Sequence, residues 1–330
     1  LFSILDTPIE ERDPYLDTEL LAFPYVNGGM FSENNLEIPN FTDELRELIL
    51  EHASSSFDWS EISPTIFGAV FESTLNPETR RSGGMHYTSI ENIHKVIDPL
   101  FLDELKDELN EIRQFKQFKT VEQRAKQFQS KLSSLTFFDP ACGSGNFLTE
   151  TYISLRRLEN EAIKLYMGDS VAFDVGQELV KVQLSQFYGI EINDFAVSVA
   201  KTALWIAENQ MLEETKDIVF ANIDFLPLKS YTNIVEGNAL KIDWETVVPK
   251  DRLSYIIGNP PFIGYSFQNK EQKENIKSVY VDENGKAYKT SGKIDFVAGW
   301  FFKASQLIQK TNIKVAFVST NSICQGDQVS

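Results

Sequence analysis

One predicted strand end constrains the fold more than any other part of the sequence. The apolar run 253–257 has the composition of a buried strand, and it leads through a glycine into Asn259, Pro260 and Pro261. Asn259 then lies at the carboxyl end of that strand, the edge at which open α/β sheets bind their ligands. The two prolines fix φ and can continue neither a strand nor a helix interior, so we expect a stiff turn.

This turn has the chemistry of a clamp for a flat amino group. Asn259 and the carbonyl of Pro260 supply two hydrogen-bond acceptors, and the ring of Phe262 follows beside them. A planar group that carries an NH2 could donate to both acceptors while it stacks on the ring. The alternative interpretation is a proline-stiffened loop with a phenylalanine at the surface.

A strand, a glycine turn and a helix are predicted earlier in the chain, around residues 135–155. A short apolar strand ends at Asp139, and Gly143 and Gly145 follow within a turn of small residues. Glycines let the backbone bend sharply and let a ligand approach without contact from a Cβ atom. The dinucleotide fingerprint needs a third glycine where this chain has Leu148, so a mononucleoside-like ligand fits the turn better than a dinucleotide.

The same strand–helix unit recurs along the chain. The strand 187–190 ends in Glu191, an acid at the position that typically holds ribose hydroxyls, and the strand 233–235 precedes Asn238. A further strand is expected at 314–319. Strands that alternate with helices predict an α/β fold with a doubly wound, mostly parallel, Rossmann-like sheet.

The remaining segments predict structure rather than chemistry. Residues 1–75 have the pattern of helices, and Thr88 begins a stretch with capping-box spacing that predicts the start of another. Residues 102–132 have the helical period of a two-sided surface element. The polar, lysine-rich segment 263–293 predicts a long functional loop.

Composition excludes several classes of protein. The net charge is −17, but residues 1–50 hold eleven acidic residues against two basic ones, so the acidity says little about the second half. Cys142 and Cys324 make a disulfide framework improbable, which predicts a reducing, cytoplasmic setting. The three histidines form no cluster with the cysteines, so we expect no metal. Because no apolar run approaches the roughly 20 residues of a membrane-spanning helix, we expect no membrane partner.

The combination of Asp139-Pro-Ala-Cys-Gly-Ser-Gly-Asn-Phe147 with Asn259-Pro-Pro-Phe262 resembles the S-adenosylmethionine-dependent DNA methyltransferases that modify adenine N6. The segment 84–88 lies where the gamma-type order places its first cofactor-contacting motif. Residues 22–29 are similar to the helical spacer of fused restriction–modification enzymes of type IIG and IIL. The resemblance implies a class I methyltransferase fold with an N-terminal helical region.

The resemblance also implies the roles of individual residues. The cofactor would be S-adenosylmethionine. Its carboxylate would be held by Tyr87 and Thr88, and its methionine part by Asp139, Pro140, Ala141, Gly143 and Gly145. Its ribose would be held by Glu191, and its adenine by Ile192 and Asn238. The reaction would take place at Asn259, Pro260, Pro261 and Phe262. Asn238 stands where an aspartate is common in this family, which leaves the direction of its hydrogen bond open.

The implied activity is direct methylation of an adenine that is flipped out of double-stranded DNA. Cytosine N4 is a chemically equivalent target, and the amide of a protein glutamine is also a planar NH2 that the turn could hold. A catalytically inactive cofactor-binding module is the remaining alternative, against which the intact Asn259 turn argues.

The same resemblance divides the chain into three parts. Residues 1–79 would form a helical spacer, 80–134 a helical segment with the first cofactor motif, and 135–330 the catalytic domain. Because the chain does not begin with Met, we expect it to be a piece of a longer protein. A target-recognition domain would follow residue 330, and the parent chain leaves room for a nuclease domain.

Overall fold

The structure, a computed structural model, describes residues 4, 7–23, 25, 40–55, 62–74, 88–167, 179–219, 233–282 and 284–325. Its centre is a five-stranded sheet in the order β3-β2-β1-β4-β5, in which every strand pair is parallel. The strands are β1 (Phe137–Asp139), β2 (Phe187–Glu191), β3 (Asn233–Glu236), β4 (Tyr255–Gly258) and β5 (Lys314–Phe317). The predicted doubly wound α/β fold is confirmed, and each strand lies within two or three residues of its expected place.

Neighbouring residues of the strands face opposite sides of the sheet, so each side has its own core. Phe137 lies in a cluster with Phe187, Ile234 and Ile257, whereas Phe138 lies in another with Ile190 and Ile256. These side chains are almost fully buried, as expected for central strands of a parallel sheet. The strand order reverses between β1 and β4, which places a crevice at their carboxyl ends.

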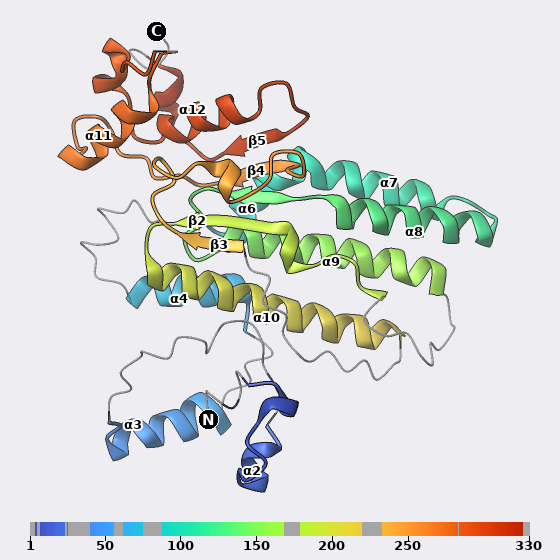
Figure 1. Cartoon of the computed structure of the whole chain (residues 1–330). Helices are drawn as coiled ribbons and strands as arrows, with labels where there is room; N and C mark the ends of the chain where they lie inside the picture. Colours follow the sequence, from blue (N-terminus) through green and yellow to red (C-terminus); the bar gives the residue numbers. More distant parts are fainter. Residues whose placement is uncertain are drawn as a thin grey trace.

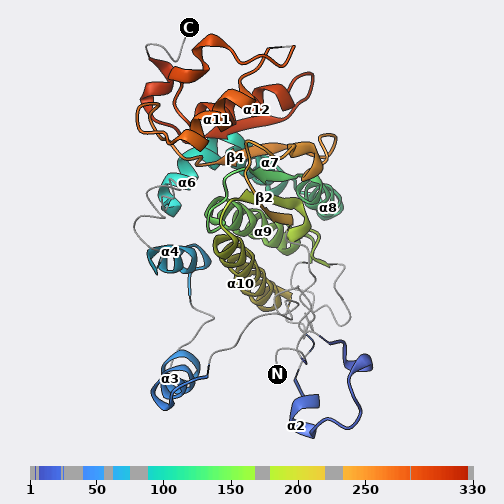
Figure 2. The ribbon, with the colours of Figure 1, turned by 60° about the vertical axis from the view of Figure 1, so that its left-hand side comes forward.

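Helices cover both faces of the sheet (Figure 1). The first face is packed against α6 (Ile90–Ile97), α7 (Asp103–Arg113), α8 (Phe118–Ser134), α9 (Asn146–Met167) and α10 (Asp194–Val219). The second face is covered by α11 (Lys270–Val279), α12 (Ala298–Leu307) and the segment that carries Trp244. Figure 2 shows the same layers from another side, with α11 and α12 above the sheet and α9 and α10 below it.

The N-terminal part contributes one helix to this body. Helix α4 (Pro64–Thr74) buries Phe67 against Val199 and Ala203 of α10. The carbonyl of Ile62 accepts a hydrogen bond from the side chain of Gln210, which fixes the start of α4 on the same helix. The short helices α2 (Thr18–Leu21) and α3 (Asp43–Glu47) lie beyond α10, away from the sheet (Figures 1 and 2). Thr42 caps α3 as its sequence predicts.

Two sequence-based expectations are wrong in detail. The lysine-rich segment after Phe262 is not one long loop, because residues 270–279 form α11 with a capping box between Asn269 and Gln272. The buried side chains of Ile276 and Val279 hold this helix on the second core. The cap of α6 is Ser89, whose hydroxyl accepts the N–H of Asn92, and not the preceding Thr88.

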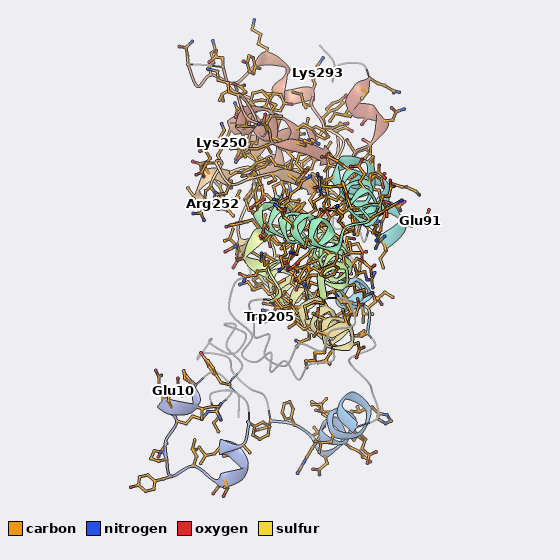
Figure 3. All side chains as sticks on the ribbon, turned by 90° about the vertical axis from the view of Figure 1, so that its right-hand side faces the viewer. Glu10, Glu91, Trp205, Lys250, Arg252 and Lys293 are labelled. Atoms are coloured by element: carbon orange, nitrogen blue, oxygen red, sulfur yellow. The ribbon has the colours of Figure 1, made fainter. Side chains whose placement is uncertain are left out.

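Charged side chains mark the outer surfaces of these layers. Figure 3 shows Lys250 and Arg252 on the side of the molecule opposite Glu91 of α6, while Trp205 lies within the helical layer. Trp205 is 3% exposed and belongs to the first core.

Within the described residues, no helix has the length and apolar composition that crossing a membrane requires.

Candidate active site

A cavity of about 340 Å³ opens at the carboxyl ends of β1, β2 and β4, where the strand order reverses. Ten of the residues expected at the site line it: Thr88, Asp139, Pro140, Ala141, Gly143, Glu191, Ile192, Asn238, Asn259 and Pro261. These residues come from positions far apart in the sequence, and the fold brings them together. The volume is within the range of roughly 300–1,000 Å³ that small-molecule sites occupy.

Asp139 is the most deeply buried acid of the cavity, at 1% exposure. One carboxylate oxygen accepts the N–H of Ala141 at 2.9 Å. Burial raises the pKa of Asp139, the hydrogen bond from Ala141 lowers it and the nearby carboxylate of Glu191 raises it, and together they bring the pKa to about 8. A positively charged group of a ligand beside this acid would lower its pKa and stabilise the carboxylate form.

Gly258 makes room for the Asp139 carboxylate from the neighbouring strand. Its φ is +144°, a backbone conformation that residues other than glycine rarely adopt. A Cβ atom at Gly258 would lie 2.4 Å from Oδ1 of Asp139 and 2.8 Å from its Cγ. The glycine that ends the predicted strand is therefore part of the site, because it lets β4 approach the acid at the end of β1.

Glu191 connects the ends of β1 and β2. Its Oε2 accepts the N–H of Gly143 at 3.0 Å, and its Oε1 accepts the N–H of Asn193 at 2.9 Å. These two bonds fix the orientation of the carboxylate, whose two oxygens are hydrogen-bond acceptors. The side chain is 6% exposed, which keeps those acceptors in a largely dry environment.

Gly145 lies outside the cavity lining and serves close packing instead. Its φ is +81°, and a Cβ atom there would lie 2.9 Å from the Cβ of Ala200 on α10. The glycine turn is also braced from the N-terminal side. A Cβ atom at Gly68 of α4 would lie 2.8 Å from both Cβ and Oγ of Ser144. The turn is thus packed against α4 at Gly68 and against α10 at Gly145.

Asn238 has a defined orientation. Its Oδ1 accepts the N–H of Leu240 at 2.9 Å, which begins the turn after β3. The oxygen is thus engaged by the chain itself, and the amide nitrogen, a donor, is the group left for a ligand. Ile192 offers an apolar side chain that is 59% exposed at the same end of the cavity.

Asn259 forms a hydrogen bond to a residue that precedes it by 171 positions. Its Nδ2 donates to Oγ1 of Thr88 at 3.0 Å. Its Oδ1 is buried and has no hydrogen-bond partner within the part of the chain that the structure describes. An unpaired buried acceptor costs free energy, which an incoming N–H donor would recover.

Three other expected site residues do not line the cavity or cannot be placed. Pro260 is buried and does not line the cavity, Phe262 is half-buried next to the lining residue Pro261, and Tyr87 lies outside the described residues.

Sequence reasoning missed a second wall of the cavity. Helix α11 contributes Asn269, Glu271, Gln272 and Asn275, and the region of α12 contributes Phe296 and Trp300. The Asn269-x-x-Gln272 capping-box spacing could have revealed the start of α11. The indole N–H of Trp300 donates to the carbonyl of Pro140 at 3.0 Å, a contact across 160 positions that has no local signal.

A parallel sheet of this order, with acids at the ends of β1 and β2 and an Asn-Pro-Pro turn at the end of β4, defines an α/β protein that binds its ligand at the topological switch point of the sheet. The chain belongs to the family of the MmeI DNA-methyltransferase domain, whose family model matches residues 115–330.

Relatives and a solved structure agree with this assignment. DNA methyltransferase A of Bacillus subtilis (strain 168) is 42% identical over all of this chain, which spans 36% of that protein. A putative type II restriction enzyme and methyltransferase of Methanocaldococcus jannaschii is 27% identical over 78% of this chain, which covers 24% of that protein. The structure of the type IIL restriction–modification enzyme MmeI in complex with DNA is similar over 99% of this chain and 42% of its own, at 42% identity and a TM-score of 0.89.

Proposed function

We propose that this chain transfers a methyl group from S-adenosylmethionine to the exocyclic N6 amine of an adenine flipped out of double-stranded DNA. The chain would do so as part of a larger restriction–modification protein, since it spans only about a third or less of the relatives it matches. The family membership supports DNA as the substrate. The adenine, the base flipping and the cofactor are inferences from the site.

The Asn259 carboxamide is the observation that carries the proposal. Its nitrogen is engaged by Thr88 while its oxygen is buried without a described partner. The oxygen can therefore accept an N–H from a substrate amine, and we assign the second N–H to the carbonyl of Pro260. Two acceptors would favour a tetrahedral amine whose lone pair is free to react, so that catalysis is mostly positioning. Phe262 would stack on the base.

The acids of the cavity fit S-adenosylmethionine. Its positively charged methionine part suits the buried Asp139, its ribose hydroxyls suit Glu191, and its adenine would lie on Ile192. The donor of Asn238 would pair with a ring nitrogen of that adenine, because its oxygen is engaged by Leu240. When bound, the cofactor would supply the methyl group from its sulfonium, leaving a neutral thioether, and the methylated amine would give up a proton to water.

The test is methyl transfer by the full-length protein to duplex DNA with a radiolabelled cofactor, followed by digestion to nucleosides. We expect label in N6-methyladenine. Label in N4-methylcytosine, or in a glutamine-containing peptide offered beside the DNA, would refute the substrate assignment. Asn259→Ala should abolish transfer and leave cofactor affinity within about threefold, since the side chain is assigned to the substrate amine. Normal transfer by that variant would refute the clamp.

A further inference from the structure

We propose that Thr88 is a positioning residue, whose hydroxyl orients the Asn259 carboxamide. The inference rests on the proposed function, because it concerns how the same clamp presents its acceptor. It adds a role to the cofactor contact that family resemblance implies for this residue, because a hydroxyl that accepts one hydrogen bond can still donate another. The hydrogen bond from Nδ2 of Asn259 to Oγ1 of Thr88, at 3.0 Å, is its starting point.

A carboxamide is nearly symmetric in shape and asymmetric in hydrogen bonding. Turned one way, Asn259 presents an acceptor to the substrate amine, and turned by half a rotation it presents an NH2 group. Two NH2 groups facing each other repel, so only the first orientation is productive. That orientation directs Nδ2 into a partly buried position, where it needs an acceptor of its own.

Thr88 supplies that acceptor. Its side chain is 8% exposed, so water does not readily take its place. Since Oδ1 of Asn259 has no partner within the described part of the chain, the hydrogen bond of Nδ2 is the interaction by which the structure orients the amide.

The position of Thr88 is itself fixed by helix α6, which begins two residues later. Ser89 caps that helix, and its residues Ile93 and Ile97 are fully buried in the first core. His94 connects α6 to α9 through a hydrogen bond of 3.0 Å to the buried Glu150, and its other ring nitrogen lies 2.7 Å from Asp98 at the end of α6. Helix α9 begins at the glycine turn, so this linkage ties Thr88 to the cofactor side of the cavity.

Two variants of Thr88 in the full-length protein separate the hydroxyl from the shape of the side chain. Thr88→Val keeps the shape and removes the acceptor, and Thr88→Ser keeps the hydroxyl. At saturating cofactor and DNA, we expect Thr88→Val to slow single-turnover methyl transfer at least about tenfold, the effect of stranding a buried donor. Saturating cofactor separates this loss of rate from any loss of cofactor affinity, and Thr88→Ser should recover the rate to within about threefold.

Ser89→Ala is the matched control. It weakens the start of α6 without removing the hydroxyl of Thr88, and transfer at saturating substrates should stay within about twofold. A loss equal to that of Thr88→Val would show that the helix start matters and would overturn the inference. The inference also fails if Thr88→Val weakens cofactor binding and leaves the saturated rate intact, or if Thr88→Ser is no better than Thr88→Val.

A double-mutant cycle adds a readout that a general structural role would not change. A carboxylate accepts through both oxygens and needs no orientation, so in the Asn259→Asp background Thr88→Val should slow the residual transfer by less than about threefold. An unchanged tenfold effect would contradict the inference. The proposed function is tested separately. If Asn259→Ala still methylates, the clamp itself is wrong, whereas a silent Thr88→Val beside an inactive Asn259→Ala refutes the role of Thr88 alone.

Discussion

The contact between Gly258 and Asp139 allows a quantitative test of how the site is built. Gly258→Ala would place a Cβ atom 2.4 Å from Oδ1 of Asp139, at a φ of +144° that alanine rarely adopts. Backbone strain of this kind costs about 1–3 kcal/mol. Overpacking against the fixed carboxylate adds about 1–3 kcal/mol more. We expect the variant to lower the free energy of unfolding by about 2–6 kcal/mol and to weaken cofactor binding, because the displaced acid belongs to the cavity.

Gly264→Ala is the control for this substitution. A Cβ atom at Gly264 would meet Phe267 at 3.6 Å and Asp295 at 3.8 Å, which are ordinary contact distances, in the turn that follows β4. Urea unfolding followed by tryptophan fluorescence, together with cofactor titration calorimetry, should show nearly parental behaviour for this variant. Equal losses of stability in both variants would refute the reasoning.

Removing the carboxylate provides a second check. In the Asp139→Ala background the clash is gone and the backbone strain remains, so Gly258→Ala should cost about 1–3 kcal/mol less than it does in the parent. A cost that is unchanged by Asp139→Ala would show that the close approach of β4 to the acid is not what requires a glycine.

Further predictions concern the glycine turn, the buried acid and the stacking ring. Gly68→Ala should weaken cofactor binding by about tenfold, since its Cβ would lie 2.8 Å from Ser144, while calorimetry on Gly292→Ala, which meets nothing within 4 Å, should find no change. Asp139 keeps its proton up to about pH 8 when folded and releases it near its ordinary value of 3.8 when unfolded. Stability should therefore fall as pH rises through this window, and Asp139→Asn should flatten that part of the curve in pH-dependent denaturation. Phe262→Ala should reduce transfer by the loss of stacking, about 1–3 kcal/mol, in single-turnover assays.

The strands and the strand-end residues could be predicted from the sequence because their signals are local. Each strand is a short apolar run next to a glycine, a proline or an acid, and parallel pairing then brings the carboxyl ends together. This is why Asp139, Glu191 and Asn259 were expected at one site before their geometry was known. Their distances and hydrogen bonds depend on the packing of the whole chain.

The starts of α6 and α11 could not be predicted correctly from local sequence patterns. Thr88 and Ser89 both carry a hydroxyl at a helix start, and the capping-box spacing favours the first. The structure uses the second, because Thr88 has a partner in Asn259 that no local pattern could reveal. Helix α11 was missed for a related reason. Its buried Ile276 and Val279 lie among lysines and glutamates, so the segment has the composition of a polar loop.

The site depends on helices that lie outside the repeating strand–helix units of the sheet. The sheet alone supplies the acids and the turn, whereas α6 brings Thr88 to Asn259 and α4 presses Gly68 against the glycine turn. Both helices precede β1 in the sequence. A substitution that moves α4 or α6 is therefore expected to displace the glycine turn or the Asn259 side chain. Helix α4, within the segment expected to be a spacer, packs on the glycine turn at Gly68, and α10 packs on the same turn at Gly145.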